Sequence, residues 1–124
     1  MIKKAVVIGG GGFNGSHVAD CLSDTGYQVI VYDKIFSKYV QKGQVMMLGD
    51  VLDSEKLSQA IIGADVVYNF AALAALNQAL KQPIKTVNIN ILGNLNVMEM
   101  CRKHGVERFI YASTVYVHSS EGGF

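Results

Sequence analysis

The chain has 124 residues, a length that suits one domain with a hydrophobic core. Half of its residues are hydrophobic and 17% are charged, which excludes a disordered chain, and the mean hydropathy of +0.25 predicts a parallel sheet whose strands are mostly buried on both faces. Eleven basic and ten acidic residues give a net charge of +1, which argues against a broad basic surface for nucleic acid.

Strands and helices alternate along the predicted chain. Short β-branched runs predict strands, and apolar residues that repeat every three or four positions predict helices. Capping residues and glycines mark the helix ends. In chain order we predict a strand at 5–8, a helix at 13–25, strands at 28–32 and 44–48, a helix from 53 or 54 to 62, a strand at 65–70, a partly helical stretch at 71–81, a long helix from 83 to 104 and a strand at 107–112.

This alternation predicts an α/β fold, a Rossmann-type doubly wound parallel sheet of about five strands in three αβα layers. One such domain would occupy residues 1–124. Ligands of these sheets bind beyond the carboxyl ends of the strands, at the point where the strand order reverses. The candidate functional positions are therefore the strand ends, namely residues 9–15, Asp33, Asp50, 70–73 and 113–114.

A glycine-rich loop follows the first predicted strand and opens a helix. Gly9, Gly12 and Gly15 form G-x-x-G-x-x-G, which leaves room for a pyrophosphate and offers it the free N–H groups of a helix N-terminus. Asp33 ends the second strand, where an acid accepts hydrogen bonds from an adenosine ribose. Its carboxylate repels a 2′-phosphate and favours NAD over NADP, although Lys34 weakens that preference. A structural glycine turn and a solvated turn aspartate are the alternatives.

A methyltransferase that binds S-adenosylmethionine is the alternative within this fold class. It also carries glycines after its first strand and an acid after its second. Because its ligand has no pyrophosphate, it does not need a third glycine in the helix. Gly15 therefore favours a dinucleotide.

Five segments in order resemble the NAD-dependent epimerase/dehydratase family, nucleotide-sugar enzymes of the extended short-chain dehydrogenase/reductase branch. The glycine loop with its helix is similar to the family's opening segment. G-D-V-L-D at 49–53 and V-Y-N-F-A-A-L at 67–73 resemble two further family segments. N-I-L-G-N-L-N at 90–96 resembles N-x-x-G-T-x-N, and G-V-E-R-F-I-Y-A-S-T at 105–114 resembles the segment that ends on the catalytic Ser/Thr.

The resemblance implies a role for particular residues of this chain. The pyrophosphate would lie on the loop formed by Gly9, Gly12, Phe13, Asn14 and Gly15, and Asp33 would bind the ribose. Asp50 and Val51 would lie at the adenine, with Ala71, Ala72 and Leu73 close to the cofactor. Thr114 would hydrogen-bond the substrate oxygen at which hydride moves, and Asn90 would hold a water on the proton path. Local backbone bonding is the structural alternative for both Thr114 and Asn90.

The sequence also departs from the family pattern. Ile8 replaces a usual Thr, Asn14 a usual apolar residue and Asn69 a common His, and Ala74 stands where several members carry a basic residue near the phosphates. The stretch V-Y-V-H at 115–118 is not the common S-x-V-Y-G; without a gap, V-H-S at 117–119 aligns with V-Y-G.

No Tyr in the chain is followed by Lys four residues later, so the family's catalytic Y-x-x-x-K is absent. We therefore expect the cofactor-binding N-terminal part of an NAD-dependent epimerase, dehydratase or reductase, truncated after the fifth strand. It would be inactive by itself. The alternative is a non-catalytic NAD(P)-binding redox sensor.

Further features predict environment and assembly. Cys21 and Cys101 are far apart without a C-x-x-C motif, so we expect packed thiols and no disulfide or metal site. The absence of a long apolar run or signal peptide predicts a soluble, cytoplasmic protein without a membrane span. The helix at 84–104 carries a stripe of apolar residues and further apolar positions beside it, which predicts a homodimer or other self-association there. The stripe consists of Ile84, Val87, Ile91, Leu95 and Met98.

Overall fold

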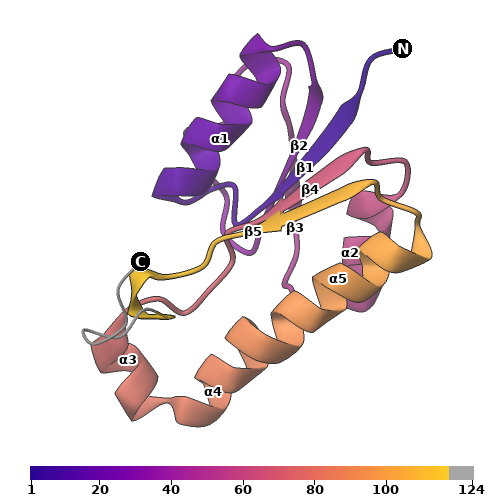
Figure 1. Cartoon of the computed structure of the whole chain (residues 1–124). Helices are drawn as coiled ribbons and strands as arrows, with labels where there is room; N and C mark the ends of the chain where they lie inside the picture. Colours follow the sequence, from indigo (N-terminus) through magenta and orange to yellow (C-terminus); the bar gives the residue numbers. More distant parts are fainter. Residues whose placement is uncertain (118–124) are drawn as a thin grey trace.

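A computed structural model describes residues 1–117 and shows one five-stranded parallel sheet (Figure 1). The strands lie in the order β3-β2-β1-β4-β5, and the direction of winding reverses between β1 and β4. At this point Ile8 pairs with Tyr32 on one side and with Asn69 on the other. The predicted Rossmann-type sheet is confirmed. The strands are β1 (Lys4–Ile8), β2 (Gln28–Asp33), β3 (Val45–Leu48), β4 (Val66–Asn69) and β5 (Arg108–Tyr111).

Helices cover both faces of the sheet and give the three predicted layers (Figure 1). Helix α1 (Phe13–Asp24) lies on one face, and α2 (Ser54–Ile61) and α5 (Asn94–Lys103) lie on the other. Successive residues of β1 enter different cores because side chains alternate along a strand. Val7 packs on the α1 side, whereas Ile8 packs on the α2 and α5 side.

Burial of the strands on both faces, which we expected for most of them, is confirmed at the centre of the sheet and is wrong at its edges. Residues 5–8 of β1 are 0% exposed. On the edge strand β3, however, Val45 is 51% and Leu48 49% exposed, and Tyr111 of β5 is 57% exposed. An edge strand has a neighbour on one side only, and the helices cover the middle of the sheet.

The helix ends follow the sequence signals. Gly26 (φ +90°) ends α1 in a Schellman motif, in which the Tyr27 N–H donates to the Leu22 carbonyl at 3.0 Å. Asp53 caps α2 by accepting a hydrogen bond from the Lys56 N–H at 3.0 Å. Packing of the cysteines is confirmed for Cys101, which is buried, and is wrong for Cys21, which is exposed.

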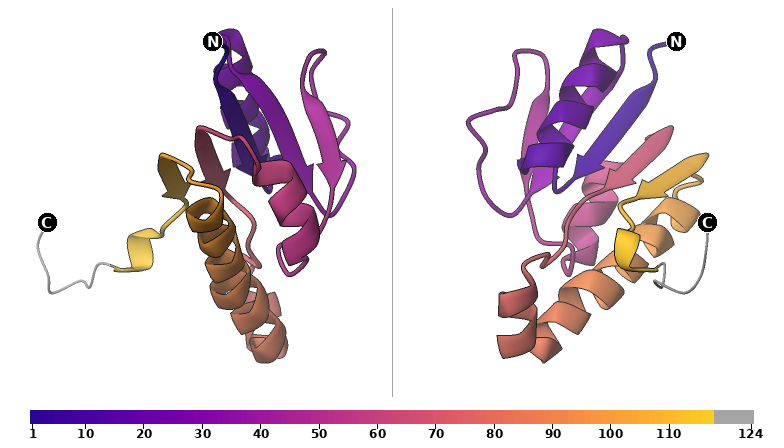
Figure 2. Two further views of the ribbon diagram at one scale, coloured as in Figure 1. Left: turned by 90° about the vertical axis from the view of Figure 1, so that its right-hand side faces the viewer. Right: turned by 60° about the vertical axis from the view of Figure 1, so that its left-hand side comes forward.

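The helix predicted at 83–104 runs on in one direction, but one turn in its middle is π-helical instead of α-helical. Helix α4 (Pro83–Val87) continues through a π-helical turn, η1 (Asn88–Gly93), into α5, and this rod extends beyond the sheet (Figure 2). A short helix, α3 (Leu76–Lys81), precedes it. At η1 the buried Gly93 lies against Val51, and an added Cβ would be 2.6 Å from a Val51 methyl. A π turn carries an extra residue, so it shifts the faces of the helix.

The apolar stripe of this rod faces solvent. Ile84 is 78% and Ile91 60% exposed, while the face that enters the core carries Val97 and Cys101. The exposed apolar surface expected from the sequence is therefore present.

Candidate functional site

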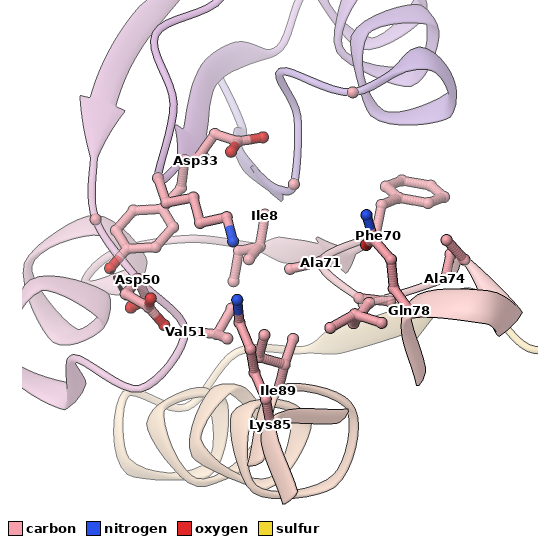
Figure 3. Close-up of a pocket in the computed structure, with 18 residues that line it drawn as sticks. Ile8, Asp33, Asp50, Val51, Phe70, Ala71, Ala74, Gln78, Lys85 and Ile89 are labelled. Carbon is pink, nitrogen blue, oxygen red and sulfur yellow. Dashed lines mark hydrogen bonds between the residues drawn. The ribbon is translucent and has the colours of Figure 1, made fainter. Parts of the chain in front are cut away.

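A pocket of about 440 Å³ lies at the carboxyl ends of the central strands (Figure 3). Its walls come from the segments that follow β1, β2, β3 and β4, and it opens where the strand order reverses. This is where a doubly wound sheet holds its ligand. The pocket is lined by Ile8, Gly9, Gly12, Tyr32, Asp33, Lys34, Gly49, Asp50, Val51, residues 70–75, Gln78, Lys85 and Ile89.

The glycine loop forms one wall, and it is built so closely that side chains do not fit. Gly9 has φ +70°, and an added Cβ there would be 2.6 Å from the Ala71 nitrogen. A Cβ at Gly15 would overlap the Gly9 carbonyl oxygen. No side chain caps α1, and within residues 1–117 the N–H groups of residues 13–15 have no acceptor. Such unpaired amides at a helix start attract an anion.

Asp33 connects the end of β2 to this loop. One carboxylate oxygen accepts a hydrogen bond from the Gly11 N–H at 3.0 Å, and the other accepts one from the Ile35 N–H at 3.2 Å. The same side chain lines the pocket. Asp33 therefore orients the glycine loop and presents a negative charge to whatever binds beside it.

Tyr32 shapes the segment that contains Asp50. Its hydroxyl donates a hydrogen bond to the Asp50 carbonyl oxygen at 2.8 Å, and a side chain at Gly49 would overlap that hydroxyl. Burial raises the pKa of Tyr32 to about 12, and the nearby negative charges of Asp53 and Asp50 add to the shift. The hydroxyl is therefore a neutral donor at physiological pH, and it fixes the backbone beside Val51.

Two asparagines fix the wall formed by residues 71–73. The Asn69 Oδ1 accepts from the Ala71 N–H at 3.1 Å, and its Nδ2 donates to the Asn94 Oδ1 at 2.8 Å. From η1, the Asn90 Oδ1 accepts from the Leu73 N–H at 2.7 Å and its Nδ2 donates to the Leu73 oxygen at 3.2 Å. Both polar atoms of the Asn90 amide therefore bind backbone.

Most of the candidate residues meet in the pocket. Eight of them line it: Gly9, Gly12, Asp33, Asp50, Val51, Ala71, Ala72 and Leu73. Gly15 packs on Gly9 without lining it. Phe13 is 81% exposed and packs edge-on against His17, and Asn14 is exposed too.

Thr114 does not line the pocket. Its Oγ1 accepts a hydrogen bond from the Tyr116 N–H at 3.2 Å, in the single turn η2 (Val115–Val117), and its side chain is exposed. The local backbone bonding that the sequence left open is therefore present. The proposed alignment at Val117 continues through 118 and 119, which lie outside the described residues.

Sequence reasoning missed Gln78 and Lys85 in the pocket lining. Figure 3 shows Lys85 projecting from α4 into the pocket beside Ile89. Residues four positions apart share a helix face, so the spacing of Lys85 and Ile89 was an available signal. It was weak, because only the fold shows which face of α4 meets the pocket.

The described part of the chain contains neither a cluster of metal ligands nor a membrane-spanning helix. Over residues 1–117, no three His, Cys, Asp or Glu side chains are grouped as metal ligands would be. In the same range, none of the helices has the length and hydropathy of a membrane span.

Residues 5–123 match the family model described as the NAD dependent epimerase/dehydratase family. A dTDP-D-glucose 4,6-dehydratase of Dictyostelium discoideum is 34% identical over 97% of this chain. An epimerase structure from Methanothermobacter thermautotrophicus superimposes with a TM-score of 0.88, at 32% identity over 92% of the chain. A UDP-glucose 4-epimerase of Thermus thermophilus, solved in complex with NAD, gives a TM-score of 0.86 at 32% identity over 97% of the chain.

The chain is much shorter than these proteins. It spans 31% of the length of the dehydratase, 36% of the Methanothermobacter chain and 41% of the Thermus chain. The similarity therefore concerns a part of each protein that includes the sheet and the pocket described above.

Proposed function

The chain belongs to the NAD-dependent epimerase/dehydratase family, and from this membership we propose that it is the NAD-binding part of a nucleotide-sugar epimerase, dehydratase or reductase. When bound, NAD accepts and can return a hydride at a sugar carbon. What the described residues supply is the binding and orientation of the dinucleotide.

The observation that carries the proposal is the composition of the pocket. It brings together two glycines of the glycine loop, an acid at the end of β2, Asp50 with Val51, and the segment 71–73, which begins with two alanines. We assign the pyrophosphate to the loop at 9–15, the adenosine ribose to Asp33 and the adenine to Asp50 and Val51. The fit is supported by the crowding at Gly9 and Gly15 and by the amides at 13–15 that lack an acceptor.

We assign NAD in preference to NADP. The 2′-phosphate of NADP would lie beside the Asp33 carboxylate, and two neighbouring anions repel each other. Asp33 is also fixed in place by its two backbone hydrogen bonds, so it cannot turn away without releasing the glycine loop.

Catalysis by this chain alone is not part of the proposal. The 124 residues contain no Y-x-x-x-K, so the usual general acid/base pair is missing from them. We keep Thr114 as the residue that binds the reacting substrate oxygen, and Asn90 as a residue of the proton path, in the larger enzyme. A nucleotide-sugar is the proposed substrate, and the cytoplasm is the proposed location.

One observation favours a second candidate, a non-catalytic NAD-binding redox sensor. The Thr114 hydroxyl is engaged in its own turn and is outside the pocket lining. A sensor would distinguish NAD from NADH without turning over a sugar. Reduction of NAD by UDP-glucose or dTDP-glucose, in a protein that contains this chain, would exclude the sensor.

The apolar stripe on the α4–α5 rod is the proposed contact between two copies of the chain. It presents several exposed aliphatic side chains on one side of a rigid element. Burying them against a second copy would remove this surface from water.

Calorimetry with NAD, NADP and S-adenosylmethionine tests the proposed function. We expect NAD to bind most tightly and S-adenosylmethionine not to bind. Preferential binding of S-adenosylmethionine would instead assign the pocket to a methyl-transfer cofactor.

A further inference from the structure

Helix α5 begins with two asparagines whose side chains bond to different parts of the molecule. Asn94 and Asn96 lie in its first turn, and residues two positions apart on a helix point about 200° apart around its axis. The Asn94 Oδ1 accepts a hydrogen bond of 2.8 Å from the Asn69 Nδ2, at the end of β4. The Asn96 Nδ2 donates to the Val51 carbonyl oxygen at 3.1 Å. The start of α5 therefore connects the end of β4 with the segment that follows β3.

Asn69 extends this connection to the glycine loop. Its Oδ1 accepts a hydrogen bond from the Ala71 N–H at 3.1 Å. The peptide that joins Phe70 to Ala71 lies directly against Gly9, where an added Cβ would be 2.7 Å from the Phe70 carbonyl carbon. The Asn69 side chain therefore lies between α5 and the backbone on which Gly9 packs.

The same end of α5 also fixes the adenine segment, which consists of Asp50 and Val51. Gly93 directly precedes α5 and packs closely on the side chain of the buried Val51, and Asn96 bonds to its carbonyl. Neither Asn94 nor Asn96 lines the pocket. The start of α5 thus relates the position of the glycine loop to that of the adenine segment without contact with a ligand.

Breaking the bond between Asn69 and Asn94 would release one side of this connection. Asn69 is only 5% exposed, and within residues 1–117 its Nδ2 has no hydrogen-bond partner besides Asn94. A buried donor without a partner is unfavourable, so the Asn69 amide would turn or its segment would shift. Either change would move the backbone beside Gly9 relative to Val51.

We propose that Asn94 is a positioning residue, which through Asn69 sets the separation between the glycine loop and the adenine segment. This inference rests on the proposed function, because it requires the adenine at Val51 and the pyrophosphate on the loop. A ligand that carries both groups gains affinity only when it can contact both parts at once. Adenosine has no pyrophosphate, so its binding does not depend on this separation.

The test compares ligands that contact both parts with one that contacts a single part. Adenosine, ADP and NAD are titrated by calorimetry into the full 124-residue chain and its variants. Asn94→Leu keeps the approximate size of the side chain and removes the acceptor, whereas Asn94→Asp keeps an oxygen that can accept from Asn69. Met98→Leu is the matched control, because the Met98 sulfur is the other partner of the Asn94 amide, at 3.8 Å. Circular dichroism checks that each variant is folded.

We expect Asn94→Leu to weaken ADP and NAD about tenfold and to leave adenosine within about twofold of wild type. Asn94→Asp and Met98→Leu should bind ADP within about twofold of wild type. Asn96→Leu breaks the other bond of α5 and should show the same difference between ADP and adenosine, which tests the inference even if Asn94→Leu does not fold.

Three results would overturn the inference. An equal loss for adenosine and ADP would show a general disturbance of the pocket. Unchanged binding of ADP to folded Asn94→Leu would show that the bond serves stability alone. A loss for Asn94→Asp as large as that for Asn94→Leu would show that the acceptor for Asn69 is not what matters.

The proposed function can fail separately. If wild type binds NAD and ADP and the two Leu variants at 94 and 96 bind them equally well, only the positioning role is wrong. If wild type binds neither NAD nor ADP, the proposed function is wrong and the positioning role is wrong with it.

Discussion

Asn90 and Leu73 are joined by two hydrogen bonds, one to each backbone polar group of Leu73. The Leu73 N–H donates to the Asn90 Oδ1 at 2.7 Å, and the Asn90 Nδ2 donates to the Leu73 oxygen at 3.2 Å. Asn90 lies in the π turn η1, and Leu73 lies in the pocket wall. The π turn is therefore tied directly to the surface on which we place the dinucleotide.

Replacing Asn90 by Ala should destabilise the chain by about 1–3 kcal/mol, because both Leu73 backbone groups would lose their partner. Urea denaturation measures the change in the free energy of unfolding. Asn88→Ala is the matched control, since Asn88 lies in the same turn and has no side-chain hydrogen bond among the described residues. Equal effects of the two substitutions would contradict this account of Asn90.

Gly15→Ala and Gly12→Ala should differ sharply in their effect on stability. An added Cβ at Gly15 would overlap the Gly9 carbonyl oxygen, whereas at Gly12 the nearest atom is that same oxygen at an ordinary 3.4 Å. We expect a loss of about 1–3 kcal/mol for Gly15→Ala and of less than about 0.5 kcal/mol for Gly12→Ala. Thermal unfolding of the two variants decides this, and a stable Gly15→Ala protein would show that the loop is looser than described.

The stability of the chain should fall at high pH through Tyr32. Burial holds the pKa of this hydroxyl at about 12, above its ordinary 10.0, so the folded state favours the neutral form. The resulting stabilisation is complete below about pH 10 and is lost as pH rises through 12. Tyr32→Phe lacks the titrating group, so its free energy of unfolding should fall less over this window than that of wild type. Parallel curves for the two proteins would exclude this role of Tyr32.

Self-association should depend on the apolar stripe of the α4–α5 rod. We expect light scattering to show a dimer or larger species for wild type as concentration rises, and a monomer for Ile91→Glu. Ile91 is 60% exposed, so the substitution should leave the melting temperature unchanged. Ile62→Glu is the control, because Ile62 is similarly exposed, at 58%, at the end of α2 and away from the stripe. A monomeric wild type would contradict the proposed contact.

The parts of the fold and site that could be predicted are those encoded by local patterns. The glycine loop, Asp33 at the end of β2 and the Asp53 cap depend on residues close together in sequence, and the structure places each as expected. Knowing that parallel strands end at one edge was enough to bring Asp50 and residues 71–73 to the same pocket.

The parts that could not be predicted depend on tertiary packing. The π turn arises where Gly93 meets Val51, which are distant in sequence, and it changes which helix face is buried. For the same reason, the pattern of apolar residues did not show that Lys85 faces the pocket. Exposure of β3 and β5 follows from the strand order, which local pattern does not specify.

The most direct test of the proposed site is a titration of the isotope-labelled 124-residue chain with NAD, followed by amide resonances in NMR. The account predicts saturable shifts concentrated at residues 9–15, Asp33, Asp50, Val51 and 71–73, with small changes along β3 and the outer face of α1. Saturable shifts centred on any other surface, or none at NAD concentrations well above those in cells, would contradict it.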